Sequence, residues 1–271
     1  MNGKALDPRL LDWLRLRIAH ACDVRESFDM ARTFGYADDA IAAGIEAASP
    51  LGSVLDSGSM KPPPLIRRAP ANLASIGTPA FGLYTLEGFA KPGECERLMA
   101  LIRHNLVPSQ VVSNPDKRRF RVSHTTLLGE LRSPLAAAID EKICRALGIR
   151  AAFSEAIEAQ SYEPGGYYDP HFDFFSAESD AHRTACSVRG NRTWTFMVYL
   201  NDDFDGGATR FTEIDRVVSP RRGMAVLWNN LNADGSPNPL SRHGGEQVTR
   251  GRKVIITKWF RLRGDGPVFH E

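Results

Sequence analysis

Four residues with metal-binding and charge chemistry constrain the fold of this chain most strongly. His171 and Asp173 form a His-x-Asp pair, His243 lies far along the chain, and Lys253 follows ten residues after it. Two imidazoles and one carboxylate can occupy one face of an octahedral metal ion and leave the opposite positions open, which suits non-haem Fe(II). The fold must therefore bring distant segments to one centre, where Lys253 can offer a cation to a dicarboxylate bound at the open positions.

The sequence before the His-x-Asp pair predicts an interrupted strand. Gly165, Gly166 and Pro170 lie where a strand would otherwise run. A break of this kind would let His171 and Asp173 leave the strand ladder and point at one centre.

A second segment is predicted to place Lys253 beside the distant histidine. Residues 253–260 are rich in β-branched side chains and predict a strand, and a turn at 249–252 precedes it. Two antiparallel strands joined by this turn would bring Lys253 back beside His243. Because alternate residues of a strand share a face, four side chains are expected to look into the metal cavity: Lys253, Ile255, Thr257 and Trp259. The combination indicates an oxygenase that consumes 2-oxoglutarate.

Residues from about 79 to 261 resemble the prolyl 4-hydroxylase branch of the 2-oxoglutarate/Fe(II) dioxygenases. Beyond the triad and Lys253, the resemblance rests on segments that follow the family's order at about its spacings: Phe89–Glu96, Arg192–Asn201, Gly206–Phe211 and Pro220–Asn229. The resemblance implies that His171, Asp173 and His243 are the metal ligands and the catalytic centre.

The pattern of short strands and turn signals predicts only a β-rich sandwich. The resemblance implies more: a double-stranded β-helix, or jelly roll, with iron between the sheets at one open end. We therefore expect a mostly β fold with flanking helices, preceded by a small helical segment. The predicted organisation is a helical N-terminal segment at 1–48, a Pro/Gly/Ser-containing linker at 49–78 and a catalytic domain at 79–271.

Apolar periodicity, capping signals and β-branched runs place the individual elements. Helices are expected at 10–19, 24–33, 37–48, 92–106 and 133–147. Strands are expected at 156–162, 192–200, 207–211, 216–219, 224–229 and 253–262.

The resemblance also implies roles for residues around the metal. Tyr162 and Thr209 would contact 2-oxoglutarate, Lys253 would pair with its distal carboxylate, and Tyr199 matches a tyrosine of the cosubstrate pocket.

A second group is expected at the substrate. Arg192 and Trp259 match positions that line the peptide site of family members, and Tyr168 is assigned to the same site. The segment 121–123 is similar to the Arg-Thr-Ser of the substrate loop, with Val122 in place of Thr, so Arg121 is also expected to bind substrate. Two neighbouring loops, 114–121 with its basic run and 174–191, are expected to be mobile.

The implied activity is hydroxylation of a prolyl residue in a peptide or protein, with Fe(II), 2-oxoglutarate and O2 required and ascorbate as a reductant. Asp173 stands where halogenating relatives have Gly or Ala, which favours hydroxylation. Two alternatives stay open: a hydroxylase of a free amino acid or small natural product on the same scaffold, and a catalytically silent binding module. The intact triad and Lys253 weigh against the second.

Composition bounds the partners and the compartment. The chain has 271 residues and a net charge of +2, too small to indicate nucleic acid or an anionic membrane as a partner. The four cysteines are far apart and form no Cys-x-x-Cys pair, so neither a zinc site nor a disulfide framework is indicated. No apolar run approaches the length of a membrane span. The cytoplasm is the expected location, and no oligomeric state is indicated.

Overall fold

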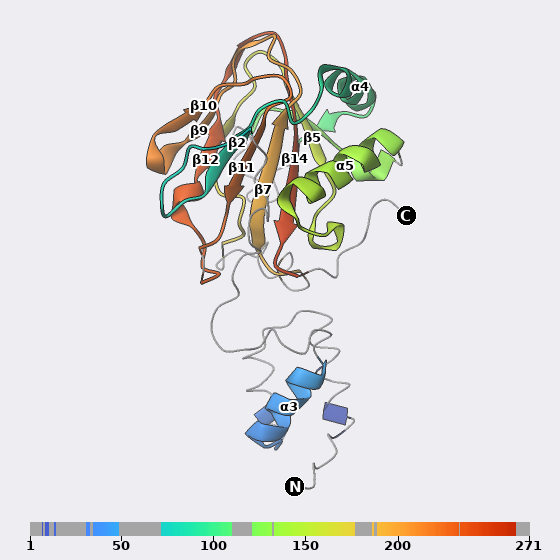
Figure 1. Ribbon diagram of the computed structural model, residues 1–271, viewed down its shortest axis with the longest axis vertical. Coiled ribbons are helices and arrows are strands. Elements are labelled where there is room, and N and C mark those ends of the chain that lie inside the picture. Colours follow the sequence, from blue (N-terminus) through green and yellow to red (C-terminus); the bar gives the residue numbers. More distant parts are fainter. Residues whose placement is uncertain are drawn as a thin grey trace.

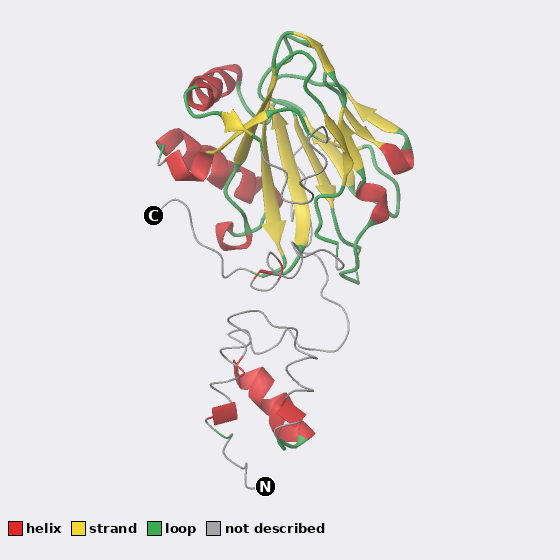
Figure 2. Cartoon of the chain, turned by 180° about the vertical axis from the view of Figure 1, so that it is seen from behind, coloured by secondary structure: helices red, strands yellow, loops and turns green. Residues whose placement is uncertain are grey.

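The computed structural model describes residues 7, 9–10, 14, 31–32, 35–48, 72–109, 121–131, 133–176, 186, 189–232 and 234–263. Two antiparallel sheets dominate this part of the chain, with helices on the outer side of the larger sheet (Figure 1). The view from behind shows the strands of the two sheets facing each other (Figure 2). The prediction of a mostly β fold with flanking helices is confirmed.

The larger sheet has eight strands in the order β1-β2-β11-β7-β14-β5-β4-β3. Its two longest strands, β7 and β14, are neighbours near its centre. Its strands are β1 (Leu73–Ser75), β2 (Leu83–Leu86), β3 (Val107–Pro108), β4 (His124–Leu127), β5 (Glu158–Tyr162), β7 (Arg192–Tyr199), β11 (Ala225–Asn229) and β14 (Lys253–Arg261).

The smaller sheet has four strands in the order β10-β9-β12-β6, and a separate two-stranded ladder pairs β13 with β8. These strands are β6 (Tyr168–His171), β8 (Asp205–Gly206), β9 (Thr209–Phe211), β10 (Arg216–Val218), β12 (His243–Gly245) and β13 (Val248–Arg250). Short 3-10 helices occupy Leu128–Leu131, Ala151–Phe153, Thr212–Ile214 and Pro239–Ser241.

Two helices cover the outer face of the larger sheet: α4 (Pro92–Arg103) and α5 (Pro134–Leu147) (Figure 1). Each begins with proline in its first turn, where the missing N–H leaves no intrahelical bond unmade. The helix α5 ends at Gly148, whose φ of 68° is the left-handed conformation that glycine adopts without steric cost.

Side-chain alternation divides the buried residues into two cores. On β7, Phe196 and Val198 pack into the core beneath α4 and α5. Their neighbours Met197 and Tyr199 point the other way, into the core between the two sheets. The inner core therefore shares its strands with the outer one, and the inner face of β7 and β14 forms a wall of the candidate site.

A buried ion pair ties α5 to the larger sheet. Lys258 of β14 is 0% exposed, and its Nζ donates to the Asp140 carboxylate of α5. The same Nζ donates to the backbone carbonyl of Glu155 at 2.8 Å. The protein itself thus supplies this buried cation with a carboxylate and a carbonyl, as a structural pair requires.

The predicted helices at 92–106 and 133–147 are confirmed as α4 and α5, and all six predicted strands are present with ends shifted by a few residues. The helix expected at 37–48 is α3 (Asp38–Ala48). The helices expected at 10–19 and 24–33 lie mostly outside the described residues, as do 49–71 of the expected linker. The sheet already begins at Leu73, inside the range expected to be linker, because 73–75 pairs with β2.

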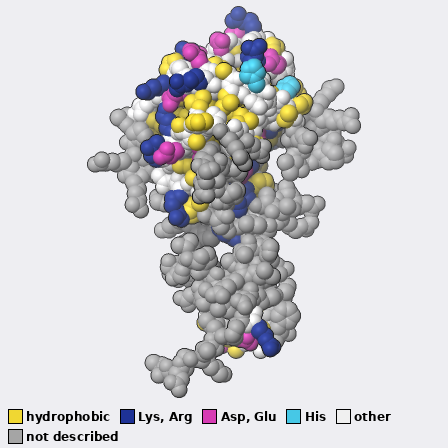
Figure 3. Space-filling model, turned by 90° about the vertical axis from the view of Figure 1, so that its right-hand side faces the viewer, with side chains coloured by type: hydrophobic (Ala, Val, Ile, Leu, Met, Phe, Trp, Pro, Cys, Tyr) yellow, Lys and Arg dark blue, Asp and Glu magenta, His cyan; other side chains and the backbone are white. Residues whose placement is uncertain are grey.

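In the described part of the chain, none of the helices combines the length and apolar character that a membrane crossing needs. On the face shown in Figure 3, acidic and basic side chains are interspersed around a hydrophobic patch.

Candidate metal centre

The two candidate histidine ligands lie directly opposite each other in the smaller sheet. His171 ends β6, His243 begins β12, and the two residues are register partners. Cross-strand partners project to the same side of a sheet, and the centres of the two imidazole rings are 4.4 Å apart. The prediction that His171 leaves the ladder is therefore wrong: its pairing with His243 is what brings the rings together. Of the two residues predicted to leave the ladder, only Asp173 lies beyond the end of β6.

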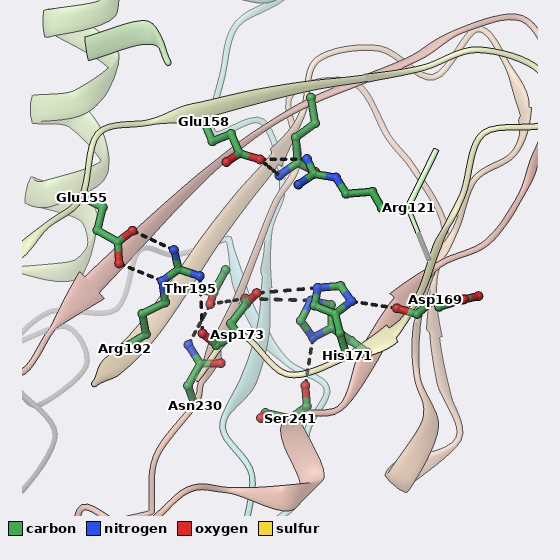
Figure 4. Close-up of polar contacts among 12 residues, drawn as sticks. Arg121, Glu155, Glu158, Asp169, His171, Asp173, Arg192, Thr195, Asn230 and Ser241 are labelled. Carbon is green, nitrogen blue, oxygen red and sulfur yellow. Dashed lines mark hydrogen bonds and ion pairs between the residues drawn. The ribbon is translucent and has the colours of Figure 1, made fainter. Parts of the chain in front are cut away.

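Backbone carbonyls set the orientation of both rings (Figure 4). The Nδ1 atom of His171 lies 2.8 Å from the carbonyl oxygen of Asp169, and that of His243 lies 2.9 Å from the carbonyl oxygen of Ser241. A carbonyl only accepts, so each Nδ1 carries the proton and donates. Both Nε2 lone pairs are thus left for a ligand, which is how metal-binding histidines are held.

The Asp173 carboxylate faces both Nε2 atoms. Its Oδ1 is 3.7 Å from His171 Nε2, and its Oδ2 is 3.9 Å from His243 Nε2. The three candidate ligand atoms all lie within 4.8 Å of one another, as one shared cation would require. Asp173 is 6% exposed and His243 is 7% exposed, and His171 is half-buried, so most of the set is shielded from bulk water.

The protonation states also suit a cation. Burial, reinforced by the neighbouring His243, lowers the pKa of His171 to about 3, so its imidazole is neutral at physiological pH. Burial opposes ionisation of Asp173, but the nearby histidines, Arg192 and a hydrogen bond from Thr195 outweigh it and lower the pKa of this carboxyl. Neutral imidazole and ionised carboxylate are the forms that bind divalent metal.

A cavity of about 370 Å³ opens beside the triad, between the two sheets. Residues 171, 173, 243, 244 and 245 form one side of it. The prediction that one face of β14 points into this space is confirmed, since Lys253, Ile255, Thr257 and Trp259 all line the cavity.

Lys253 reaches the cavity by a different route from the predicted hairpin. The strand β12 belongs to the smaller sheet and β14 to the larger one, and β13 between them pairs with β8. The hairpin prediction is therefore wrong, because the chain crosses between sheets after His243. Lys253 and His243 face the same cavity from opposite sheets.

The ammonium group of Lys253 is buried without a carboxylate partner. The residue is 2% exposed, and its Nζ donates to the Gly207 carbonyl at 2.7 Å. The Nζ also lies 5.2 Å from the ring centre of Tyr162 and 5.5 Å from that of Tyr199. Among the described residues, none places a carboxylate within ion-pair distance of it. Burial lowers the pKa of Lys253 to about 7.

The other residues expected at the cosubstrate surround this lysine. Tyr162 and Thr209 line the cavity. Tyr199 is fully buried behind the wall, and its hydroxyl is 2.6 Å from Thr209 Oγ1. Tyr162 donates to Gln160 Oε1 at 2.7 Å.

The two arginines expected at the substrate line the cavity and are already paired (Figure 4). Arg192 forms two hydrogen bonds of 2.7 Å to the carboxylate of Glu155, and its guanidinium carbon is 3.9 Å from the ring centre of Trp259. Arg121 donates to Glu158 at 2.8 Å.

The Arg121 guanidinium also lies over the ring of Tyr168, 4.9 Å from its centre. Tyr168 in turn stacks on His171, with ring centres 3.6 Å apart. The four expected substrate residues are thus brought together beside the metal triad. The basic run before Arg121 and most of the loop 174–191 fall outside the described residues.

Sequence reasoning missed several residues of the site. Gln160 and Glu158 alternate with Tyr162 on β5, so they share its face, and strand periodicity could have identified them. Glu155 precedes β5 in an irregular segment and gives no local signal. Thr195 contacts Asp173, and Asn230 contacts Thr195. Both have the sequence pattern of ordinary buried polar residues.

Comparison with known proteins adds a family to this geometry. Residues 157–261 match the model of the 2OG-Fe(II) oxygenase superfamily. This match contains the triad, Lys253 and Thr209.

Two curated relatives are similar to a larger part of the chain. "Probable prolyl 4-hydroxylase 4" of Arabidopsis thaliana is 32% identical over 205 residues, which cover 66% of this chain and 67% of that protein. "Prolyl 4-hydroxylase subunit alpha-1" of Bos taurus is 32% identical over 164 residues, which cover 60% of this chain. The chain spans only 30% of the length of the bovine protein.

A solved structure gives independent support for the fold. The 2OG complex of a viral collagen prolyl hydroxylase from Paramecium Bursaria Chlorella virus-1 superposes with a TM-score of 0.54 at 22% identity, covering 66% of this chain and 95% of that one. Together with the facing sheets, the likeness confirms the predicted double-stranded β-helix.

Proposed function

The chain belongs to the prolyl 4-hydroxylase-like branch of the 2OG-Fe(II) oxygenase superfamily, and on that premise we propose that it hydroxylates a prolyl residue of a peptide or protein. One observation carries the proposal: a buried His-Asp-His set and a buried lysine without a carboxylate partner face one cavity. A metal-dependent oxygenase that binds a dicarboxylate needs both features in one space.

His171, Asp173 and His243 fit Fe(II) as its protein ligands. Two neutral imidazoles and one carboxylate are the donor set typical of a non-haem Fe(II) oxygenase, and each imidazole is already fixed by a backbone carbonyl. When bound, the iron supplies the activation of O2 that is coupled to oxidative decarboxylation of 2-oxoglutarate. The protein keeps this chemistry in a buried space and determines which C–H bond of the substrate lies nearest the metal.

Lys253 is the residue we assign to the distal carboxylate of 2-oxoglutarate. None of the described residues gives Lys253 a carboxylate partner, and the distal carboxylate would supply this negative charge. A charge-assisted hydrogen bond in a dry pocket is strong. Thr209 and Tyr162 add hydroxyl groups beside it on the cavity wall. Tyr199 supports the site from behind, through its contact with Thr209.

The substrate half of the cavity favours a peptide over a free amino acid. A free amino acid carries an α-carboxylate that needs an available cation, but Arg121 and Arg192 are each held by a glutamate. Leaving either glutamate buried and unpaired would be costly. A prolyl residue inside a peptide has neither a free α-carboxylate nor a free α-amino group, so it needs no such cation.

The cavity wall offers such a peptide apolar surface and a hydrogen-bond donor. Tyr168, Phe172 and Trp259 line the wall. The buried indole Nε1 of Trp259 has no hydrogen-bond partner among the described residues. Buried donors are nearly always paired in native proteins, so a substrate carbonyl is a suitable acceptor for this group.

The decisive experiment compares substrates of one chemistry and increasing size. Purified protein with Fe(II), 2-oxoglutarate and ascorbate is incubated with free proline, N-acetylproline amide and peptides of several residues around a central proline. Product gain of one oxygen atom is measured by mass spectrometry and succinate is measured in parallel. We expect the peptides to react best, because remote contacts help to position the reacting carbon. A peptide with alanine at the central position and a His171→Ala protein serve as controls.

The alternative, a hydroxylase of a free amino acid or small natural product, predicts a different result. If free proline or another free amino acid reacts as well as any peptide, the prolyl-peptide proposal is wrong. Arg192→Ala should impair hydroxylation more than uncoupled loss of 2-oxoglutarate, since Arg192 lies in the substrate half. Arg250→Ala is the matched control, because Arg250 is an exposed arginine paired with Asp205.

We also propose that this activity is cytoplasmic. The cysteines in the described part of the chain, Cys95, Cys144 and Cys186, are free thiols. Unpaired thiols are typical of proteins from a reducing compartment.

A further inference from the structure

A series of hydrogen bonds holds the carboxylate of Asp173 through its Oδ2 atom. Asp173 lies beyond the end of β6, so no strand ladder fixes its position. Thr195, in the middle of β7, donates from Oγ1 to Asp173 Oδ2 at 2.6 Å (Figure 4). Both residues are buried, with Thr195 at 0% exposure. A residue of the larger sheet thus holds a candidate metal ligand that lies just after a strand of the smaller sheet.

The direction of this hydrogen bond is set by a third residue. Asn230 donates from Nδ2 to Thr195 Oγ1 at 2.8 Å. An amide nitrogen only donates and a carboxylate only accepts. The single hydroxyl proton of Thr195 must therefore go to Asp173, and Asn230 removes the competing arrangement.

Asn230 is itself fixed by the backbone. It is 0% exposed, its N–H donates to the Thr193 carbonyl at 2.8 Å, and its own carbonyl accepts from Asn238 N–H at 2.9 Å. The series Asn230–Thr195–Asp173 thus starts just after the end of β11, at a residue whose backbone is hydrogen-bonded on both sides.

The two oxygens of Asp173 are consequently unequal. Each oxygen faces one histidine, with Oδ1 3.7 Å from His171 Nε2 and Oδ2 3.9 Å from His243 Nε2. Only Oδ2 accepts the short hydrogen bond, and within the described residues Oδ1 accepts none. We propose that Thr195 and Asn230 are positioning residues that hold Oδ2, so that Asp173 offers Oδ1 as the single anionic ligand. This inference rests on the proposed metal centre. A carboxylate released from this hold would no longer be oriented before the metal binds, so metal affinity should fall.

The test measures metal affinity rather than turnover. Mn(II) replaces Fe(II), and its dissociation constant is measured by titration calorimetry and by the electron paramagnetic resonance signal of free Mn(II). Thr195→Val keeps the side-chain shape and removes the donor. It should raise the Mn(II) dissociation constant about 10- to 100-fold, the usual effect of losing a group that orients a metal ligand. Thr195→Ser retains the hydroxyl and should restore affinity close to that of the wild type.

Thr193→Val is the matched control. Thr193 is an equally buried threonine two residues away on β7, and its hydroxyl donates to the Phe260 carbonyl instead. Its loss should lower thermal stability without changing Mn(II) affinity. Asn230→Ala should weaken Mn(II) binding in the same direction as Thr195→Val but by less, because Thr195 keeps its proton and loses only its orientation.

The outcomes separate this proposal from the proposed function. If the wild type binds no Mn(II), the metal centre is wrong and the positioning role is wrong with it. If the wild type binds Mn(II) and Thr195→Val stays within about threefold, as Thr193→Val should, the positioning role alone is overturned. If Thr195→Val does not fold, Asn230→Ala compared with Thr195→Ser decides by the same measurement.

Discussion

Two buried lysines on one strand, Lys253 and Lys258, have opposite environments. Both lie on β14, and they are 2% and 0% exposed. Lys258 points toward α5, where Asp140 and the Glu155 carbonyl satisfy it. Lys253 points into the cavity, where among the described residues it has one carbonyl and two aromatic rings but no carboxylate. Equal burial therefore does not imply an equal role: the completed pair is structural, and the incomplete one indicates a ligand.

The contrast between Lys253 and Lys258 depends most on a metal being bound in the cavity beside Lys253. Asp173→Ala removes the only anionic member of the triad and should abolish 2-oxoglutarate-dependent succinate production, because Fe(II) loses its charged ligand. Succinate release by purified protein is the measurement, and circular dichroism checks that the variant is folded. Unchanged turnover would remove the iron assignment and with it the functional reading of Lys253.

Lys253→Met and Lys258→Met should separate binding from stability. In Lys253→Met the 2-oxoglutarate dissociation constant should rise roughly 30-fold to several-thousand-fold, since losing one partner of a buried charge pair costs about 2–5 kcal/mol. The free energy of unfolding should stay equal or increase, because an unpaired buried cation is removed. Anaerobic titration calorimetry and urea unfolding give the two quantities. A change in 2-oxoglutarate affinity below about threefold would show that Lys253 is not the carboxylate partner.

Lys258→Met should show the reverse pattern. It leaves the Asp140 carboxylate buried without its cation, so the free energy of unfolding should fall by about 3–5 kcal/mol. The double variant Lys258→Met/Asp140→Leu should recover much of this loss, because both charges are then gone. Urea unfolding measures the effect. If Lys258→Met instead weakened 2-oxoglutarate binding and left stability unchanged, the two lysines would not differ as the structure indicates.

The smallest expected effect is a pH dependence specific to Lys253. Burial lowers the pKa of Lys253 to about 7, and a bound carboxylate would raise it again. Below that pKa the lysine is already charged and affinity should be flat. Above it, binding must take up one proton, so the 2-oxoglutarate dissociation constant should rise by up to about tenfold per pH unit. Lys253→Arg stays charged throughout, so its affinity should lack this slope. A wild type with flat affinity from about pH 6 to about pH 9 would contradict the burial argument.

The same contrast explains what could be predicted from the sequence. The inward face of β14 follows from period-two alternation, and so does the outward direction of Lys258. The triad was predictable because His171, Asp173 and His243 carry a rare combination of ligand types. The distinction between a paired and an unpaired lysine was not, because Asp140 lies on a helix distant in sequence.

Long-range pairing also limited the fold prediction. Strands such as β3 and β8 contain two residues each, too few to show alternation. The register of His171 with His243 depends on how β6 pairs with β12 in the smaller sheet, and these strands lie too far apart along the chain for local patterns to encode it. Glu155 orients Arg192 from an irregular segment, where neither periodicity nor turn chemistry marks it.

The pairing of His171 with His243 has a mechanical consequence. In the described smaller sheet β6 is an edge strand, and its register with β12 is irregular. Edge segments with few backbone bonds open at low free-energy cost. A metal ion held by both histidines would act as a clasp between residues far apart along the chain, and closing so long a loop strongly restricts the unfolded chain. Metal binding would then raise the free energy needed to separate β6 from the rest of the smaller sheet.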